Sequence, residues 1–305
     1  MRGWLGKING IVILISRKFL ALLCKLDRKL QLPFNADRHY CGVIMSTVSH
    51  DMASDVDEKY YTEQYWQIIK KHLNRLVISD EVSCLDLGCG QGRFVVPLAD
   101  WCSRYDGRVI GVDVSVAAIE EAKKNVELSG QQNIQFKAEN IHEYITTVAD
   151  ASVDVVFFLE VIFFLPNYEA VLTHIVRVLK PGGFLMASFR SQYFDVLFSL
   201  KHGMWDSLNV LLNQRGGRLW GKDIFFNWHT ADEIAEILEN KYALQLLELR
   251  GIGCCSGIAG DPFGDIVSPS KLSKSEFDRL MDVELEMGRH VPDAGRYILT
   301  IAQKK

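Results

Sequence analysis

Cysteine and proline are scarce in this sequence, and the few cysteines do not indicate a disulfide or metal scaffold. The 305 residues include seven Pro and seven Cys, and the cysteines form no C-x-x-C pair and no cluster with histidine at metal-ligand spacing. An odd, scattered set of cysteines disfavours a disulfide framework and a zinc site, and it favours a reducing compartment. We therefore expect a cytoplasmic protein without a metal centre.

Long uncharged apolar runs are also missing, even near the hydrophobic N-terminus. Apolar residues recur there every three or four positions, but Arg17 and Lys18 interrupt them, so no uncharged apolar stretch reaches 18 residues. A membrane-spanning helix is therefore not expected. Residues 1–40 carry eight Lys/Arg and two Asp/Glu, which predicts a basic amphipathic helix within residues 1–45.

Three interpretations of this basic helix remain open. It could make peripheral contact with an anionic membrane through residues 1–40, because its charge and its apolar stripe suit such a surface. It could instead pack on the body of the protein as a lid. Translation could also begin later, at Met45 or Met52, which lie just before an acidic segment.

A surplus of positive charge is absent from the rest of the chain. Subtracting residues 1–40 from the totals leaves 26 basic and 36 acidic residues for 41–305. Binding to a phosphate backbone needs a basic surface. The sequence therefore excludes nucleic acid as the expected partner and favours a small-molecule or lipid-like partner.

Strand-like and helix-like segments alternate from residue 56 onward, which predicts an α/β fold with a mostly parallel sheet and helices on both faces. The segment Val153–Leu159 is almost wholly apolar, as expected of a parallel strand covered on both sides. The expected strands are Ser83–Leu87, Arg108–Val112, Ile134–Phe136, Val153–Leu159, Phe184–Phe189, 244–250 and 296–303. The expected helices are Tyr60–Leu76, Gly92–Cys102, Ser115–Ser129 and Asn167–Leu179.

The same pattern divides the chain into parts. Residues 55–190 form the expected ligand-binding core, and residues 229–305 complete the sheet. Between them, 191–228 breaks the alternation and is rich in Phe, Leu and Trp. We expect this aromatic insertion to cover a substrate site, with an oligomer interface as the alternative.

A glycine-rich turn follows the first expected strand. It reads Asp86-Leu87-Gly88-Cys89-Gly90-Gln91-Gly92, and the second strand ends at Asp113, 27 residues after Asp86. Glycines allow a tight turn and close approach of the backbone to a ligand. A carboxylate at the end of the second strand can accept both ribose hydroxyls of a nucleoside, although Asp113 could also simply cap the next helix.

With these motifs the sequence resembles the class I S-adenosylmethionine-dependent methyltransferases. The match runs from about residue 60 to 190 and includes, in order, CLDLGCGQG, VIGVDVSVAAIEEAKKN, FKAENI, DVVFFLEVIFFLP and VLKPGGFLMAS. The resemblance implies a Rossmann-like, seven-stranded, mostly parallel sheet with an antiparallel last strand. It also implies S-adenosyl-L-methionine as cofactor and methyl transfer as activity. With the acidic body and the aromatic insertion, we expect a small-molecule or lipid-like acceptor.

The resemblance places the cofactor residue by residue. The turn with Asp86, Gly88, Cys89, Gly90 and Gly92 would wrap the methionine portion and the ribose side. The remaining cofactor-binding positions are Asp113 at the ribose, Val114 at the adenine, Asn140 and Ile141 at the adenine edge, and Leu159 and Glu160 at the methionine end. Asn140 stands where the family usually has Asp; its side-chain carbonyl can still accept a hydrogen bond, without the charge.

A catalytic base is harder to assign. His229 is the candidate, because histidine titrates near neutral pH. It also directly precedes Thr230 and Glu233, which form a T-x-x-E capping box, so His229 could have only a structural role beside that cap.

Two other function classes share the expected fold. A nicotinamide dehydrogenase would carry G-x-G-x-x-G, but the third glycine position here is Arg93. A non-catalytic S-adenosylmethionine-binding or scaffold protein would keep the glycine turn and show no turnover.

Overall fold

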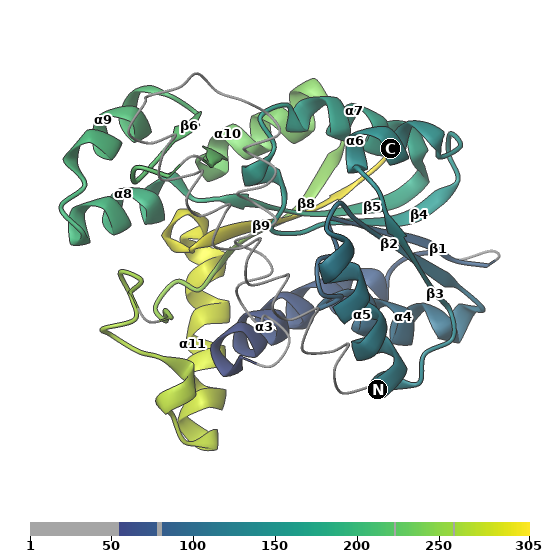
Figure 1. The fold of residues 1–305 in the computed structure, drawn as a ribbon, viewed down its shortest axis with the longest axis horizontal. Helices are drawn as coiled ribbons and strands as arrows, with labels where there is room; N and C mark the ends of the chain where they lie inside the picture. Colours follow the sequence, from purple (N-terminus) through teal and green to yellow (C-terminus); the bar gives the residue numbers. More distant parts are fainter. Residues whose placement is uncertain (1–54, 78–80, 223, 259) are drawn as a thin grey trace, which may run out of the picture.

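A seven-stranded sheet forms the centre of the protein (Figure 1). The computed structural model describes residues 55–77, 81–222, 224–258 and 260–305, so the expected helix within residues 1–45 and its membrane contact lie outside the described residues. The sheet order is β3-β2-β1-β4-β5-β9-β8. Its strands are β1 (Ser83–Leu87), β2 (Arg108–Asp113), β3 (Ile134–Ala138), β4 (Val153–Phe158), β5 (Leu179–Arg190), β8 (Gln245–Ile252) and β9 (Tyr297–Gln303).

The direction of the strands follows from the connections between them. The first five strands pair in parallel, because a helical crossover returns the chain to the same end of the sheet each time. The last strand, β9, lies between β5 and β8 and is antiparallel to both. The expected fold class, including the antiparallel last strand, is confirmed.

Helices cover both faces of this sheet. In Figure 1, α3, α4 and α5 lie on one side, and α6, α7 and α10 lie on the other. The α-helices are α3 (Val56–Leu73), α4 (Val95–Cys102), α5 (Val116–Ser129), α6 (Ile141–Thr147), α7 (Tyr168–Val178), α8 (Gln192–Lys201), α9 (Trp205–Asn213), α10 (Ala231–Glu236) and α11 (Lys274–His290). Shorter helical turns are η1 (Ser103–Tyr105), η2 (Ile162–Phe164), η3 (Ile237–Lys241), η4 (Pro269–Lys271) and η5 (Pro292–Ala294).

The two faces of the sheet produce two hydrophobic cores. Successive residues of a strand point to opposite faces, so in β4 Val155 and Phe157 join the cluster under α3 and α4, while Val156 and Phe158 join the cluster under α7. All four are fully buried. This double burial explains why the segment is apolar at nearly every position.

Local signals place several helix starts. The Ser115 hydroxyl accepts a hydrogen bond from the Ala118 N–H at 3.2 Å and caps α5, as its sequence position predicts. The capping box of Thr230 and Glu233 also forms, at the start of α10. The first described helix begins at Val56 rather than Tyr60, because the Asp55 carboxylate caps its first turn.

The region 191–228 forms a layer of its own beyond the end of β5. It contains α8, α9 and a two-stranded hairpin of β6 (Gly216–Arg218) and β7 (Phe225–Asn227). Trp228 anchors this layer: it is fully buried, and its indole N–H lies 3.1 Å from Leu211 O and 2.9 Å from Gln214 O.

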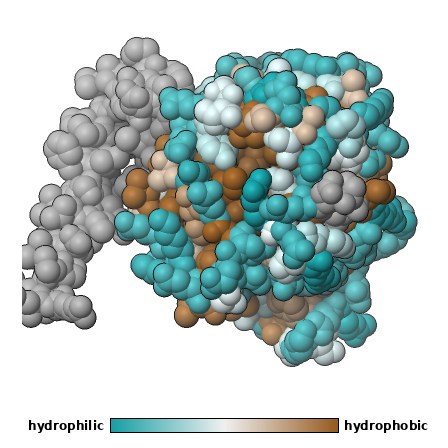
Figure 2. Space-filling model, turned by 90° about the vertical axis from the view of Figure 1, so that its right-hand side faces the viewer, coloured by the Kyte–Doolittle hydropathy of each residue, from teal (hydrophilic) through white to brown (hydrophobic). Residues whose placement is uncertain are grey.

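The surface follows the usual division between polar and apolar residues. The face in Figure 2 is hydrophilic over most of its outline, with hydrophobic residues nearer its middle. Within the described ranges, no helix combines the length and the apolar character that crossing a membrane requires.

Replacing Phe157 tests the core that carries the site. Phe157→Ala should lower the free energy of unfolding by about 3–5 kcal/mol, because a buried aromatic ring leaves a cavity that its neighbours fill only partly. Urea unfolding followed by circular dichroism measures this change. Leu128→Ala, at an exposed position of α5, is the control and should stay within about 0.5 kcal/mol of the parent protein; equal effects of the two substitutions would contradict the assignment of the core.

Candidate functional site

The glycine turn after β1 is fastened to the end of β2. The backbone N–H groups of Gly88 and Cys89 donate to Val112 O at 2.7 and 3.0 Å, and the Gly90 N–H donates to Asp113 Oδ2 at 2.9 Å. These three bonds fix the backbone of the turn beside the neighbouring strand. The conformation of the turn is therefore set by bonds within the protein.

Glycine is required at the first position of this turn. Gly88 has φ +80°, and a Cβ built there would lie 2.3 Å from Val161 Cγ2. The left-handed backbone and the close approach both exclude a side chain. Gly92 is also left-handed, with φ +82°, and a Cβ there would lie 3.2 Å from Ala122 Cβ on α5.

Asp113 organises the turn from the end of β2. One carboxylate oxygen accepts the Gly90 N–H, and the other accepts the Ser115 N–H at 2.8 Å. Burial raises the pKa of this carboxyl group, and the two backbone bonds oppose that rise. Each carboxylate oxygen keeps lone-pair capacity for a further donor.

Asp86 lies in the same region, fully inside the protein. Its side chain is 2% exposed, and Oδ2 has no hydrogen-bond partner among the described residues. Burial, followed by the neighbouring negative charge of Asp113, raises the pKa of Asp86 to about 7. A buried carboxylate beside the glycine turn therefore titrates near neutral pH.

One cavity of about 500 Å³ extends from the glycine turn to the aromatic insertion. At the end near the turn it is lined by Gly88, Gly90, Gln91, Val114, Asn140 and Ile141. Its middle is lined by Glu58, Arg93, Phe94, Leu159, Glu160 and Val161. At the far end it is lined by Phe163, Phe164, Leu165, Arg190, Phe198, Trp220, Lys222, Ile224, Phe226, Ile258, Asp261, Arg296 and Tyr297. We call this far part the acceptor end.

The cavity brings together most of the residues that the sequence assigned to the cofactor. Seven of them line it: Gly88, Gly90, Val114, Asn140, Ile141, Leu159 and Glu160. Asp86, Cys89, Gly92 and Asp113 do not belong to the lining. Of these, Cys89 is 7% exposed and packs in the hydrophobic core, and burial raises the pKa of its thiol.

Asn140 caps a helix in addition to lining the cavity. Its side-chain oxygen accepts the His142 N–H at 2.9 Å and so caps α6. One lone pair of that oxygen remains for another donor. The predicted contact with an adenine amino group is compatible with this cap and remains a prediction.

A charged network that sequence reasoning missed lies in the middle of the cavity. Arg93 pairs with Glu58 Oε2 at 2.9 Å and with Glu160 Oε1 at 2.8 Å. Glu160 has φ +57°, an unusual backbone conformation for a residue with a side chain, and its N–H donates to Ser188 Oγ at 2.6 Å. Such strained residues cluster at functional sites.

The position of Arg93 also separates this site from a dinucleotide-binding fingerprint. In that fingerprint the third glycine allows a helix to pack closely on a strand. Here the position carries a long side chain that faces the cavity and joins two carboxylates. The turn therefore differs in its residues and contacts from the nicotinamide-binding fingerprint considered above.

His229 lies outside the cavity lining. Its ring is buried, its Nε2 atom lies 2.9 Å from the hydroxyl of Tyr168, and burial lowers its pKa to about 4. The ring is therefore neutral at pH 7, with hydrogen-bonding and packing contacts to its neighbours. This placement favours the structural role of His229 over the catalytic one.

The acceptor end combines aromatic rings with two arginines that come from distant parts of the chain. Arg190 ends β5 and lies opposite Tyr297 in the β5–β9 ladder, and Arg296 directly precedes β9. Arg190 pairs with Asp195, and Arg296 pairs with Asp261 at 3.0 Å. Strand pairing across about a hundred residues creates this arrangement, so no local motif could have revealed it.

Comparison with known proteins assigns the family. The model of a methyltransferase domain family matches residues 78–242, which is more than half of the chain. The fold and the glycine turn agree with that match. The chain belongs to this methyltransferase domain family, and the resemblance to the class I S-adenosylmethionine-dependent methyltransferases is confirmed.

Individual relatives show how far the likeness extends. The arsenite methyltransferase of Halobacterium salinarum is 39% identical over 99 residues, which are 32% of this chain and 25% of that protein, so the chain spans a quarter of the length of this curated relative. A solved structure of an S-adenosylmethionine-dependent methyltransferase from Listeria monocytogenes has a TM-score of 0.53 at 17% identity, covering 80% of this chain and 98% of that one. The N-methyltransferase NodS from Bradyrhizobium japonicum, solved with S-adenosyl-L-homocysteine, has a TM-score of 0.50 at 16% identity, covering 86% and 96%. At these identities the two structures establish the shared fold.

A substitution in the glycine turn tests its role in binding. Gly88→Ala should raise the Kd for S-adenosyl-L-homocysteine by about tenfold or more, because the new methyl group collides with Val161 and displaces the turn. Isothermal titration calorimetry gives the Kd. Gly130→Ala is the matched control: it has φ +73° but no atom within 4 Å of its Cβ. Parallel losses of affinity in both variants would contradict the prediction.

The pKa of Asp86 predicts a pH dependence of stability. An Asp in the unfolded chain titrates near 3.8, whereas Asp86 in the folded protein titrates near 7. Between these values the folded state holds the extra proton, so the free energy of unfolding should fall as pH rises from about 4 to 7, by up to about 4 kcal/mol. Asp86→Asn should remove this part of the slope in urea unfolding measured across that range. Asp282→Asn, at an exposed position of α11, should keep the slope of the parent protein; an unchanged slope in Asp86→Asn would show that Asp86 does not cause it.

Proposed function

We propose that the protein transfers a methyl group from S-adenosylmethionine to a small organic acceptor bound at the aromatic, acceptor end of the cavity. The observation that carries this proposal is the single cavity that joins the glycine turn to the acceptor end. Donor and acceptor would thus share one cavity. Holding both partners in one site supplies the proximity and alignment on which such a displacement depends.

The residues around the glycine turn fit the cofactor. Gly88 packs so closely on Val161 that any Cβ would collide with it, so only glycine keeps the backbone of the turn in this position at the cavity wall. Asp113 would hold the ribose hydroxyls, and Val114, which is 39% exposed in the cavity wall, would contact the adenine. The network of Arg93, Glu58 and Glu160 would bind the methionine end, whose amino and carboxylate groups need opposite charges.

The chemistry requires little covalent help from the protein. When bound, S-adenosylmethionine would supply the methyl group: a nucleophilic atom of the acceptor would bond to the methyl carbon in line with the carbon–sulfur bond, which breaks and releases S-adenosyl-L-homocysteine. Phe163, Phe226 and Trp220 would exclude water and orient the acceptor. Tyr297 has a pKa raised to about 12 by burial, so at neutral pH its hydroxyl can donate a hydrogen bond but does not act as a base.

The likeness to the arsenite methyltransferase supports methyl transfer but not its substrate. The matching stretch is 39% identical and covers 32% of this chain. The aromatic lining of the acceptor end supports an organic, ring-bearing or lipid-like acceptor instead.

Asp113 offers the most direct test of the cofactor site. Asp113→Ala should weaken binding of S-adenosyl-L-homocysteine by roughly 2–3 kcal/mol, because it removes charge-assisted hydrogen bonds and releases the Gly90 N–H. Isothermal titration measures the loss. Glu139→Ala is the control, since Glu139 is an exposed carboxylate just beyond the end of β3 and does not line the cavity.

Turnover separates the enzyme from a binding protein. Methyl transfer from radiolabelled S-adenosylmethionine to members of a small-molecule library should be detectable and should be lost in Asp113→Ala. Cofactor binding without turnover of any acceptor would favour the non-catalytic scaffold. Absence of cofactor binding would overturn the proposed function itself.

A further inference from the structure

Arg190 presents an incompletely satisfied guanidinium to the acceptor end. The residue is 8% exposed and lines the cavity. Its Nε donates to both carboxylate oxygens of Asp195, at 2.6 and 2.8 Å. Among the described residues, no acceptor atom bonds to Nη1 or Nη2. Four N–H donors of a buried cation therefore remain for a ligand.

In an ion pair with only a structural role, hydrogen bonds within the protein would satisfy the remaining donors of the arginine. Burying two charges costs several kcal/mol, and the pair compensates this cost only when hydrogen bonds satisfy the remaining donors. Among the described residues, the Arg190–Asp195 pair leaves those donors unused, because the Asp195 carboxylate, fully buried in the first turn of α8, accepts hydrogen bonds from Nε alone. Asp195 thus holds the guanidinium through Nε and leaves the two Nη groups of this cavity-lining residue, called the fork below, for a ligand.

Three aromatic rings lie close to the guanidinium group of Arg190. The guanidinium carbon of Arg190 lies 5.0 Å from the ring centroid of Trp220, 5.5 Å from Phe226 and 5.7 Å from Phe163. These distances allow cation–π attraction, which is stronger in a desolvated site. The same three rings line the cavity, so a ligand at the fork also meets an apolar wall.

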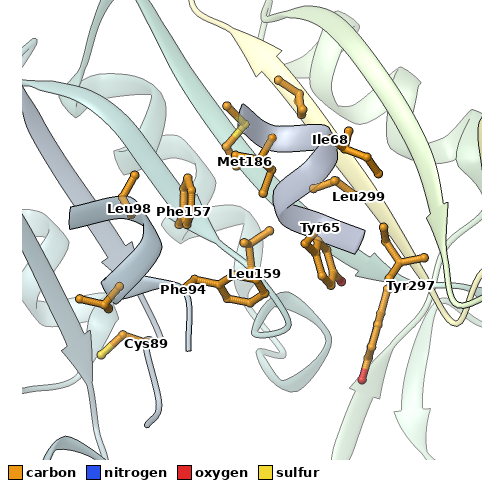
Figure 3. Close-up of a cluster of buried hydrophobic side chains, with 14 of the residues drawn as sticks. Tyr65, Ile68, Cys89, Phe94, Leu98, Phe157, Leu159, Met186, Tyr297 and Leu299 are labelled. Atoms are coloured by element: carbon orange, nitrogen blue, oxygen red, sulfur yellow. The ribbon is translucent and has the colours of Figure 1, made fainter. Parts of the chain in front are cut away.

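Tyr297 adds a polar group to this wall. Its ring stacks on Phe163 with centroids 5.5 Å apart and an interplanar angle of 19°. Figure 3 shows the ring extending away from the packed cluster of Met186 and Leu299, with the hydroxyl at its far end. Because Tyr297 pairs with Arg190 across β5 and β9, the hydroxyl and the fork belong to the same end of the cavity.

The charges of the described lining residues divide between the two ends. Near the methionine position, Glu58 and Glu160 outnumber Arg93, which suits a cofactor with one net positive charge. At the acceptor end the cations are Arg190, Lys222 and Arg296, and the anions are Asp261 in the wall and Asp195 behind it. Each of the two arginines pairs with one of these aspartates, and the Nη groups of Arg190 remain for an anionic ligand.

We propose that the acceptor is a small carboxylate with an aromatic or similarly flat apolar body, whose carboxylate is held by the Nη groups of Arg190. The planar fork matches a carboxylate in a bidentate manner. The rings of Phe163, Trp220 and Phe226 hold the apolar body, and the carboxylate serves as the anchor while another atom receives the methyl group. This inference rests on the proposed function, since it names the substrate class of the same site.

The test compares carboxylates with their neutral amides in the protein loaded with S-adenosyl-L-homocysteine. The probes are benzoate with benzamide, cinnamate with cinnamamide, and anthranilate with anthranilamide, each titrated by isothermal calorimetry. For at least one pair, the carboxylate should bind about tenfold tighter or more, as expected for charge-assisted hydrogen bonds in a buried site. Equal affinities in every pair, or no binding of any carboxylate, would overturn the inference.

Variants assign the preference to Arg190. The double variant Arg190→Gln/Asp195→Asn removes both charges together, so it leaves no unpaired charge in the interior. In this variant the ratio of carboxylate to amide affinity should fall to about one, and Arg190→Lys, which keeps the charge but loses the fork, should give an intermediate ratio. A full preference in the double variant would contradict the role of Arg190.

Controls distinguish a loss of the carboxylate preference from a failure of the proposed function. Arg215→Gln removes an exposed arginine that pairs with Glu233 outside the cavity, and it should leave the preference intact. Affinity for S-adenosyl-L-homocysteine, measured first in every variant, should remain within about twofold of the parent protein. If the parent protein itself fails to bind S-adenosyl-L-homocysteine, the proposed function falls; if it binds the cofactor product but shows no carboxylate preference, only the substrate class falls.

Discussion

The fastening of the glycine turn to the end of β2 is the interaction on which the site depends. Three backbone N–H groups in succession, from Gly88 to Gly90, bond to Val112 O and to the Asp113 carboxylate. This arrangement needs parallel pairing of β1 and β2, which brings the carboxyl ends of both strands to the same edge. The turn can then approach a ligand with its backbone, because Gly88 has no side chain to collide with Val161.

A second constraint shapes the other end of the cavity. The antiparallel insertion of β9 between β5 and β8 places Tyr297 opposite Arg190 and brings Arg296 beside them. Each arginine is paired with an aspartate from a loop or helix that covers the cavity. The sheet therefore positions residues at both ends of the cavity. Its parallel strands place the glycine turn, and its antiparallel strands place the arginines of the acceptor end.

Local sequence information was sufficient where structure depends on neighbours in the chain. The apolar strand around Phe157, the cap at Ser115 and the capping box at Thr230 all form where their residue types predict. Local reasoning left two roles open for His229: its intrinsic pKa suggested a base, and its position before a cap suggested a structural role. Tertiary packing buries the ring beside Tyr168 and lowers the pKa, which favours the structural role.

The sequence by itself determined the fold class, the glycine turn and the positions around Asp113, because these depend on short segments whose residues adjoin in the chain. Tertiary structure alone decided which charges share a space. The contacts of Arg93 with Glu58 and Glu160, and the setting of Arg190 among the rings of the 191–228 layer, join segments separated by tens of residues or more. Such contacts arise from strand order and helix packing, for which no spacing rule along the chain exists.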